Sequence, residues 1–247
     1  MKLARVLSPL AALVILVSSG ASAIVGPARD GGSFSDRVVM VLSRGGEGSG
    51  FCTGVVLAPR IVLTAAHCLR AAGNIAVLYR DDAGAPVLVP VAATAAHPEY
   101  HEDAVRKRLV SIDLGLIETA TPLPAAFRAA ELADVAPAVG DAVTLVGFGI
   151  AREGEPKTGG TARTATLRVS EPLSQILLWA DDPENSGSGA CSGDSGGPIF
   201  ASDGRTLLAL VAWTKGEKGH KCGVVTQGPL LAPARGWIDA VLARWKP

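Results

Sequence analysis

The chain has 247 residues, with 23 Lys and Arg against 23 Asp and Glu, and four cysteines. Its zero formal balance, without a long basic run, excludes a nucleic-acid or heparin binder, because phosphate contacts require clustered cations. A hydrophobic fraction of 48% and a charged fraction of 19% exclude a disordered chain, and the length allows one or two domains with a real core.

The first 23 residues have the pattern of a secretory signal peptide. Lys2 and Arg5 precede an apolar run over residues 10–17, which small residues follow up to Ala23. The run is far shorter than the roughly 20 residues that span a bilayer, so we expect cleavage near Ala23 rather than a membrane anchor. The mature chain, residues 24–247, would then be secreted or periplasmic, with no membrane association. In an oxidising compartment four cysteines favour two disulfides over a metal site.

Short apolar, β-rich runs bounded by turn residues recur along the mature chain in two sets. The first set comprises residues 37–42, 54–57, 61–63, 75–79, 86–91 and 114–117, and the second comprises residues 142–147, 164–169, 176–180, 198–200, 207–213 and 224–226. This spacing predicts an all-β sandwich or barrel.

Three further segments complete this organisation. Residues 121–139 are rich in Ala and Pro and are interpreted as the connection between the two sets of strands. Residues 152–160 are predicted to form an exposed loop. After Pro233, apolar residues recur at helical spacing, which predicts a C-terminal helix packed on the core over residues 233–245.

Three short segments carry residues with catalytic chemistry. His67 follows an apolar strand in 64–68, Asp113 lies among apolar residues in 111–116, and Ser195 lies in the glycine-rich turn 193–198. A serine hydroxyl is a poor nucleophile, so it needs a neighbouring base, and that base needs a group that fixes its tautomer. Each segment alone has an ordinary explanation, as a surface histidine, a strand cap or a turn. The three together predict a nucleophile, a base and an orienting acid.

With these segments the chain resembles the trypsin-like (chymotrypsin-fold) serine endopeptidases. The resemblance covers almost all of residues 24–247, from Ile24-Val25-Gly26 through the His67 and Ser195 segments to the Trp237 helix. It implies an all-β fold of two antiparallel six-stranded barrels, over residues 24–120 and 137–230, with the cleft between them and the C-terminal helix at the end.

The resemblance also implies a role for each site residue. Ser195 is expected to be the nucleophile, His67 the general base and then acid, and Asp113 the orienting carboxylate. The backbone N–H groups of Gly193 and Ser195 are expected to form the oxyanion hole. Ile24, freed by cleavage, is expected to pair through its ammonium group with Asp194.

The four cysteines fit the same pattern. The resemblance implies disulfides between Cys52 and Cys68, beside His67, and between Cys191 and Cys222, beside the serine turn. A zinc site is the alternative, but it lacks the paired short spacings. We therefore expect no metal and no cofactor. His97 and His101, four residues apart with acids nearby, are a second and weaker candidate for a cation site.

The expected specificity pocket departs from the family pattern. Gly189 and Ala190 stand where trypsin-type enzymes carry an acid, and Ala212-Trp213-Thr214 replaces the usual Ser-Trp-Gly wall. We expect a preference for small or apolar residues before the scissile bond, and Ala212 cannot donate a side-chain hydrogen bond to the buried acid. One alternative stays open, in which an acid from elsewhere reaches the cleft and reverses this preference: Asp181, Asp182, Glu184 or Glu217.

The resemblance implies protein or peptide substrates, a possible proteinaceous inhibitor and a monomer. Abundant Ala and Arg are typical of GC-rich genomes and suggest a bacterial secreted member of the family. Two rival functions use the same residues: a protease-fold binding protein that has lost activity, and an esterase or transferase with the same acyl chemistry.

Overall fold

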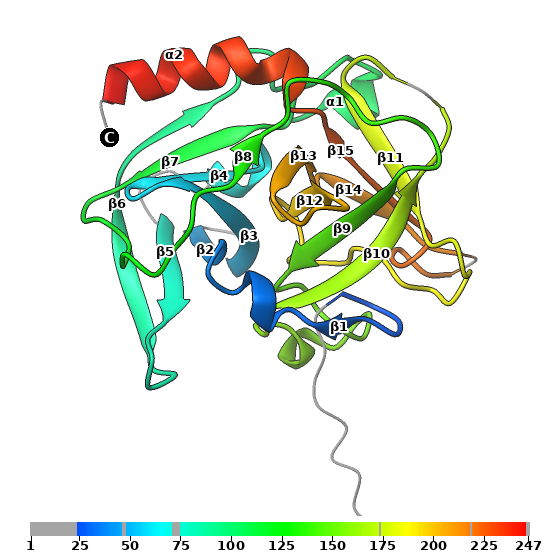
Figure 1. Ribbon diagram of the computed structural model, residues 1–247, viewed down its shortest axis with the longest axis horizontal. Helices are drawn as coiled ribbons and strands as arrows, with labels where there is room; N and C mark the ends of the chain where they lie inside the picture. The colour runs from blue at the N-terminus through cyan, green and yellow to red at the C-terminus, as the bar shows by residue number, and fades with distance from the viewer. Residues whose placement is uncertain (1–23, 46–47, 71–74, 173, 218, 246–247) are drawn as a thin grey trace, which may run out of the picture.

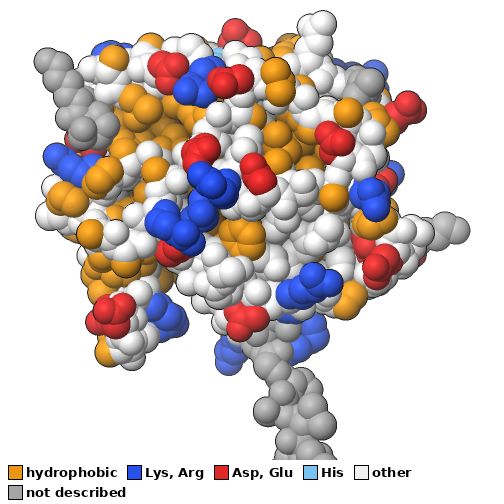
Figure 2. Space-filling view, viewed as in Figure 1, with side chains coloured by type: hydrophobic (Ala, Val, Ile, Leu, Met, Phe, Trp, Pro, Cys, Tyr) orange, Lys and Arg blue, Asp and Glu red, His pale blue; other side chains and the backbone are white. Residues whose placement is uncertain are grey.

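The computed structural model describes residues 24–45, 48–70, 75–172, 174–217 and 219–245 (Figure 1). The predicted signal peptide, residues 1–23, lies outside the described residues. Figure 2 shows one face of the molecule, on which acidic and basic side chains are mixed with apolar ones. In the part of the chain described, no helix is both long and apolar enough to cross a membrane.

The first set of strands closes into a six-stranded antiparallel barrel. Its strands follow the order β2-β3-β4-β7-β6-β5 around the ring. Their bounds are β2 Val38–Gly45, β3 Gly48–Ala58, β4 Ile61–Thr64, β5 Ile75–Arg80, β6 Pro86–Ala96 and β7 Gly115–Thr119. The barrel encloses a cluster of β-branched residues that includes Val41, Val62 and Ile117, as expected where alternate side chains of every strand point inward.

The second set forms a nine-stranded sheet, six of whose strands complete a ring. In order around the ring these are β15 (Val225–Pro229), β11 (Leu177–Asp181), β10 (Arg163–Val169), β9 (Ala142–Gly147), β12 (Pro198–Ala201) and β13 (Thr206–Leu210). β13 and β15 meet through a bridge between Ala209 and Leu230. Gly228 lies so close to the Leu210 carbonyl that a Cβ there would overlap it.

Three further short strands extend this sheet, and two of them, β1 (Arg29–Asp30) and β8 (Glu131–Leu132), are absent from the predicted set. β1 pairs with β10, β14 (Trp213–Lys215) pairs with β15, and β8 runs parallel to β13 within the predicted connection. The predicted run 207–213 is therefore two strands. It breaks at Val211, whose N–H and C=O bond to Gly197 and Gly196 of the serine turn at 2.9 and 2.7 Å.

The start of the mature chain belongs to the second ring, not to the first barrel as predicted. Ile24 is fully buried in the core of the second ring, and Val25 pairs with Gly189. The first barrel accordingly begins at Val38. The predicted loop 152–160 is largely exposed, but it contains a 3-10 turn whose Thr158 is buried and accepts hydrogen bonds from Ala151 and Arg152.

The helices pack where the two halves meet. After a 3-10 turn at Ala232–Ala234, α2 (Arg235–Trp245) buries Ile238 and Val241 in a cluster shared with residues of both rings. Figure 1 shows α2 lying beside the first barrel. A one-turn helix, α1 (Ala104–Lys107), was not predicted. His97 is buried against Trp237, ring centroids 4.9 Å apart, and therefore serves in packing rather than as a metal ligand.

Candidate active site

His67 and Asp113 meet because they follow and precede two paired strands. His67 lies in the 3-10 turn Ala66–Leu69 after β4, Asp113 lies just before β7, and Thr64 of β4 pairs with Gly115 of β7. The imidazole Nδ1 lies 2.6 Å from Asp113 Oδ2, and the His67 backbone N–H donates to Oδ1 at 2.9 Å. Two contacts to one carboxylate orient the ring and leave Nε2 for another partner.

Ser195 lies in the turn that leads into β12, against the barrel that carries His67. Its carbonyl accepts from Thr53 N of β3 at 2.8 Å and lies 3.9 Å from Cys68 Sγ, the neighbour of His67. Of the hydrogen bonds among the described residues, none joins the His67 ring to Ser195 Oγ. Such a bond is often loose until a ligand is bound. The structure thus forms the contact between His67 and Asp113, and it packs the Ser195 backbone against β3, which is disulfide-bonded to the residue after His67.

The amides of Gly193 and Ser195 are available to a ligand. Among the described residues, neither N–H donates to a protein acceptor. Gly193 has φ +96°, and a Cβ there would overlap the Phe51 ring, so both its conformation and its surroundings require glycine. Two free amides separated by one residue match the donor pair of an oxyanion hole.

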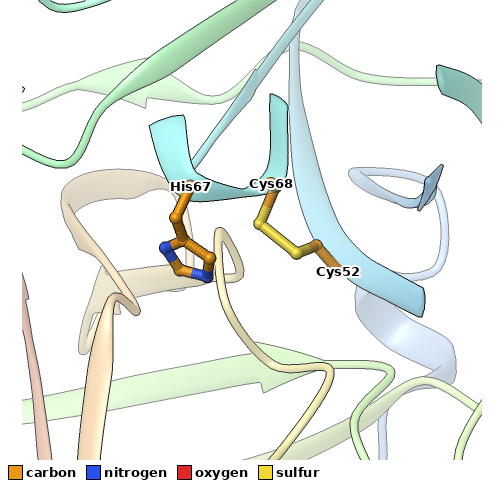
Figure 3. Close-up of side chains that lie close together, drawn as sticks. All are labelled: Cys52, His67 and Cys68. Atoms are coloured by element: carbon orange, nitrogen blue, oxygen red, sulfur yellow. A yellow bond between two sulfur atoms is a disulfide. The ribbon is translucent and has the colours of Figure 1, made fainter. Parts of the chain in front are cut away.

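Both disulfides implied by the resemblance are present. Cys52 bonds to Cys68, and Cys191 bonds to Cys222. Figure 3 shows the His67 ring beside the first disulfide, with the two sulfurs joined. The ligand atoms of Cys52, His67 and Cys68 lie within 4.8 Å of one another, which would suit a metal ion. Sulfurs bonded to each other provide no thiolate, so this cluster is no metal site.

Asp194 is completely buried behind the serine turn. Its carboxylate accepts from Gly149 N at 2.8 Å and from Cys191 N at 2.9 Å, and a Cβ on Gly147 or Gly149 would overlap it. Burial raises the pKa of Asp194 to about 7. Among the described residues, no cation pairs with it. A carboxyl group in this position would be stabilised in its ionised form by a buried cation.

Ile24 is buried in the same half of the molecule as Asp194. It is completely inaccessible, and its φ of +58° is rare for a β-branched residue. Val25 and Gly189 exchange backbone hydrogen bonds at 3.2 and 3.3 Å, which anchors the segment beside the expected pocket. In this chain Ile24 is joined to Ala23, so its nitrogen is an amide.

Two threonines, one of them an expected pocket residue, bond to the backbone of Ala190. Thr214 and Thr226 stand opposite each other on β14 and β15. Thr214 Oγ1 donates to the Ala190 carbonyl at 2.9 Å, and the Ala190 N–H donates to Thr226 Oγ1 at 3.1 Å. Thr226 is only 1% exposed and was not among the predicted site residues, because only the folded chain brings β15 against the loop that carries Ala190.

The acids left open as alternatives lie in segments close to Gly189 in the chain or in space. Asp182 accepts hydrogen bonds from its own loop, from Ser186 and Ser188 among others. Burial alone would raise the pKa of Asp182, but these hydrogen bonds hold it below its usual value. Asp181, Asp182 and Glu217 line a separate cavity of about 810 Å³ that Gly189 and Ala190 do not border. Gly223 lines the same cavity and packs against Gly189, so these acids lie near the expected pocket and keep the alternative of an acidic pocket open.

An apolar groove extends from His67 along the cleft. It has a volume of about 600 Å³. Its lining includes Leu109, Val110, Ile176, Trp179 and Trp213. Trp213 is 41% exposed and Val110 is 66% exposed, although both are apolar. Exposed apolar side chains in a concave site are typical of a binding surface.

The sequence is similar to those of known proteases from insects and humans. The sequence model of the family described as Trypsin matches residues 24–234. Trypsin iota of Drosophila melanogaster is 29% identical over 212 residues, covering 76% of this chain and 77% of that protein. Human kallikrein-4 is 25% identical over 202 residues, covering 76% of each chain. These insect and human relatives give no support to the bacterial source suggested by composition.

Two solved structures share the fold. A scabies mite inactivated protease paralogue aligns with a TM-score of 0.71 and 23% identity, covering 89% of this chain and 99% of its own. Mouse neuropsin, a serine protease, aligns with a TM-score of 0.70 and 22% identity, covering 87% and 99%. The expected chymotrypsin-like architecture is thereby confirmed. One of these two structures is of an inactivated protein, so the fold does not decide activity, which depends on the residues in the cleft.

Proposed function

The chain belongs to the trypsin family of serine endopeptidases, and on that premise we propose that it hydrolyses peptide bonds through an acyl-enzyme on Ser195. The observation that carries the proposal is the double contact between His67 and Asp113, opposite a turn with two free amides. The contact holds a ring proton on Nδ1, so that Nε2 faces away from the carboxylate and can act as the base.

The proposed reaction has two stages, acylation of Ser195 and hydrolysis of the acyl-enzyme. Ser195 Oγ bonds to the carbonyl carbon while His67 Nε2 takes its proton, and the carbonyl oxygen becomes an oxyanion that accepts from the amides of Gly193 and Ser195. The C–N bond then breaks as His67 returns the proton to the leaving amine. Water repeats the sequence on the acyl-enzyme and releases the acid. Asp113 stays ionised and stabilises the imidazolium.

A fluorophosphonate probe tests this function against a protein that only binds. We expect one adduct, on Ser195, in protein that begins at Ile24, and none in the Ser195→Ala variant. Absence of the adduct in correctly processed protein would identify a binding protein with a protease fold. An adduct without peptide cleavage, but with ester hydrolysis, would favour the esterase alternative.

We further propose a preference for small residues before the scissile bond. The side chains of Thr214 and Thr226 both reach Ala190 across the expected pocket and reduce its depth. Gly189 offers no charge to a Lys or Arg side chain. The apolar groove beside His67 would take the apolar residues that precede this position. A peptide library gives the test, and a preference for Arg or Lys would contradict the proposal.

We propose that cleavage between Ala23 and Ile24 activates the protein. The new ammonium group at Ile24 would pair with buried Asp194, whose pKa burial raises to about 7. A left-handed conformation costs about 1–3 kcal/mol at a residue such as Ile24, and cleavage would release that constraint. N-terminal sequencing of the exported protein is the test, and a start at Ser22 or Asp30 would refute it.

The remaining expectations concern the setting of the enzyme. We propose export of residues 24–247 as a monomer that acts on protein or peptide substrates outside the cytoplasm and is open to a proteinaceous inhibitor. The pattern of residues 1–23 and the two disulfides support this setting. Fractionation of cells that express the full chain, with size-exclusion chromatography of the product, tests it.

A further inference from the structure

Thr53 on β3 touches the serine turn at two points, although the sequence does not mark it as a site residue. Its side chain is fully buried. Its N–H donates to the Ser195 carbonyl at 2.8 Å, and its hydroxyl donates to the Gly193 carbonyl at 2.9 Å. The same hydroxyl accepts from the backbone N–H of Phe148 at 3.0 Å. Thr53 thus joins the first barrel to both parts of the proposed oxyanion hole.

The direction of these bonds follows from their chemistry. The Phe148 amide can only donate, so it must use a lone pair of the Thr53 hydroxyl. The single hydroxyl proton is then left for the Gly193 carbonyl, which can only accept. Both partners of this buried hydroxyl are therefore determined, and the bond to Gly193 has a fixed polarity.

The bond matters because of the peptide group that it holds. The two donor amides belong to the peptide groups 192–193 and 194–195, whose carbonyls accept from Ile150 N and Gly197 N, each at 2.8 Å. The peptide group between them has two partners: its Gly193 carbonyl accepts from the Thr53 hydroxyl, and its Asp194 N–H donates to the Cys191 carbonyl at 3.0 Å. Gly193 has no side chain to restrict its rotation. If the middle group turns, both flanking N–H groups change direction.

We propose that Thr53 is a positioning residue for the oxyanion hole, whose hydroxyl keeps the amides of Gly193 and Ser195 convergent on the reacting carbonyl oxygen. The inference rests on the proposed function, because it assumes that an oxyanion forms there. Thr53 touches no substrate. It acts through the orientation of the 193–194 peptide group, and so its effect appears in the transition state rather than in substrate binding.

Substitutions at Thr53 test the proposal on protein that begins at Ile24. Thr53→Val keeps the shape and removes the hydroxyl, whereas Thr53→Ser keeps the hydroxyl. Thr119→Val is a matched control, because Thr119 is equally buried on β7 and its hydroxyl bonds to the Thr121 carbonyl at 2.8 Å. Removing a whole oxyanion donor costs about 10²- to 10³-fold in kcat, which sets the upper limit for Thr53→Val.

We expect Thr53→Val to lower kcat by about 10- to 100-fold with KM changed less than twofold. Affinity for a peptide aldehyde, whose hemiacetal oxygen occupies the hole, should fall by the same factor. Thr53→Ser should retain most of both, and Thr119→Val should lose only thermal stability. If Thr53→Val does not fold, Thr53→Ser and Thr53→Ala, which differ only in the hydroxyl, provide the same comparison.

Two results would overturn the inference, and they are distinguishable. If the wild type is active and Thr53→Val has the same kcat and the same aldehyde affinity, the hydroxyl contributes only to stability. A wild type that neither cleaves peptides nor reacts with the fluorophosphonate would refute the proposed function, and the role of Thr53 with it.

Discussion

The two threonines that bond to Ala190, Thr214 and Thr226, lead to a prediction about substrate choice. Each hydroxyl bonds to the backbone of Ala190, so the two side chains are held across the pocket. We expect wild-type protein to cleave a peptide with Ala before the scissile bond much faster than the matching peptide with Phe. Replacing both threonines by glycine removes the obstruction and should admit the larger side chain.

The magnitude follows from the apolar surface that a phenyl ring would bury. Full burial of a Phe side chain is worth about 1.5–3 kcal/mol, which corresponds to roughly 10- to 150-fold in kcat/KM. The double variant Thr214→Gly/Thr226→Gly should therefore raise kcat/KM for the Phe peptide by about that factor. The Ala peptide is the internal control, since its short side chain does not reach either threonine.

The assay is hydrolysis of paired chromogenic peptides that differ only at this position. Thermal unfolding of each variant accompanies it, because two new glycines lower stability by about 0.5–1 kcal/mol each. Thr226→Gly alone should have the larger effect, because Thr226 is almost completely buried and Thr214 is partly exposed. A wild type that accepts Phe as well as Ala, or a double variant with an unchanged ratio, would refute the reasoning.

Three other predictions concern the catalytic acid, the buried carboxyl and the first disulfide. Asp113→Asn should lower kcat by about 10⁴-fold without unfolding the protein, because an amide cannot hold the imidazole in the required tautomer; single-turnover kinetics and a thermal melt measure both. In the uncleaved Ser195→Ala chain, Asp194 stays protonated when folded up to about pH 7 but ionises near pH 4 when unfolded, so stability should fall as the pH rises through that window. The free energy of unfolding should fall by on the order of 4 kcal/mol over this pH range. Denaturant titrations should show no such fall in a chain that begins at Ile24, and the same pH dependence of stability in both chains would contradict the pairing. Replacing the Cys52–Cys68 disulfide by two alanines should cost about 3 kcal/mol, measured as a lower urea midpoint, and an unchanged midpoint would contradict this estimate.

Most strands and the catalytic residues were predictable because their signals are local. The apolar run 142–147 coincides with β9. The residues of the Ser195 turn are informative for the same reason, because its glycines adopt conformations or close contacts that other residues cannot. Where a signal lies within a few neighbouring residues, sequence reasoning identified the element and named the candidates for its chemistry.

The errors arose where a segment pairs with a distant one. Residues 24–30 were assigned to the first barrel by their position in the chain, yet Ile24 is buried in the second ring and β1 pairs with β10. Likewise β8 was hidden in a segment rich in Ala and Pro, because its strand partner, β13, lies far along the chain. Such pairings depend on the assembled core, and no local pattern predicts them.

The sequence alone determined the family and the three catalytic candidates, because these depend on which residues are present. The tertiary structure decided which groups face one another: Thr226 lies across from Ala190, and the Thr53 hydroxyl bonds to Gly193. The physical reason is that a hydroxyl acts only within about 3 Å of its partner, and strand register sets that distance between residues 36 and 140 positions apart.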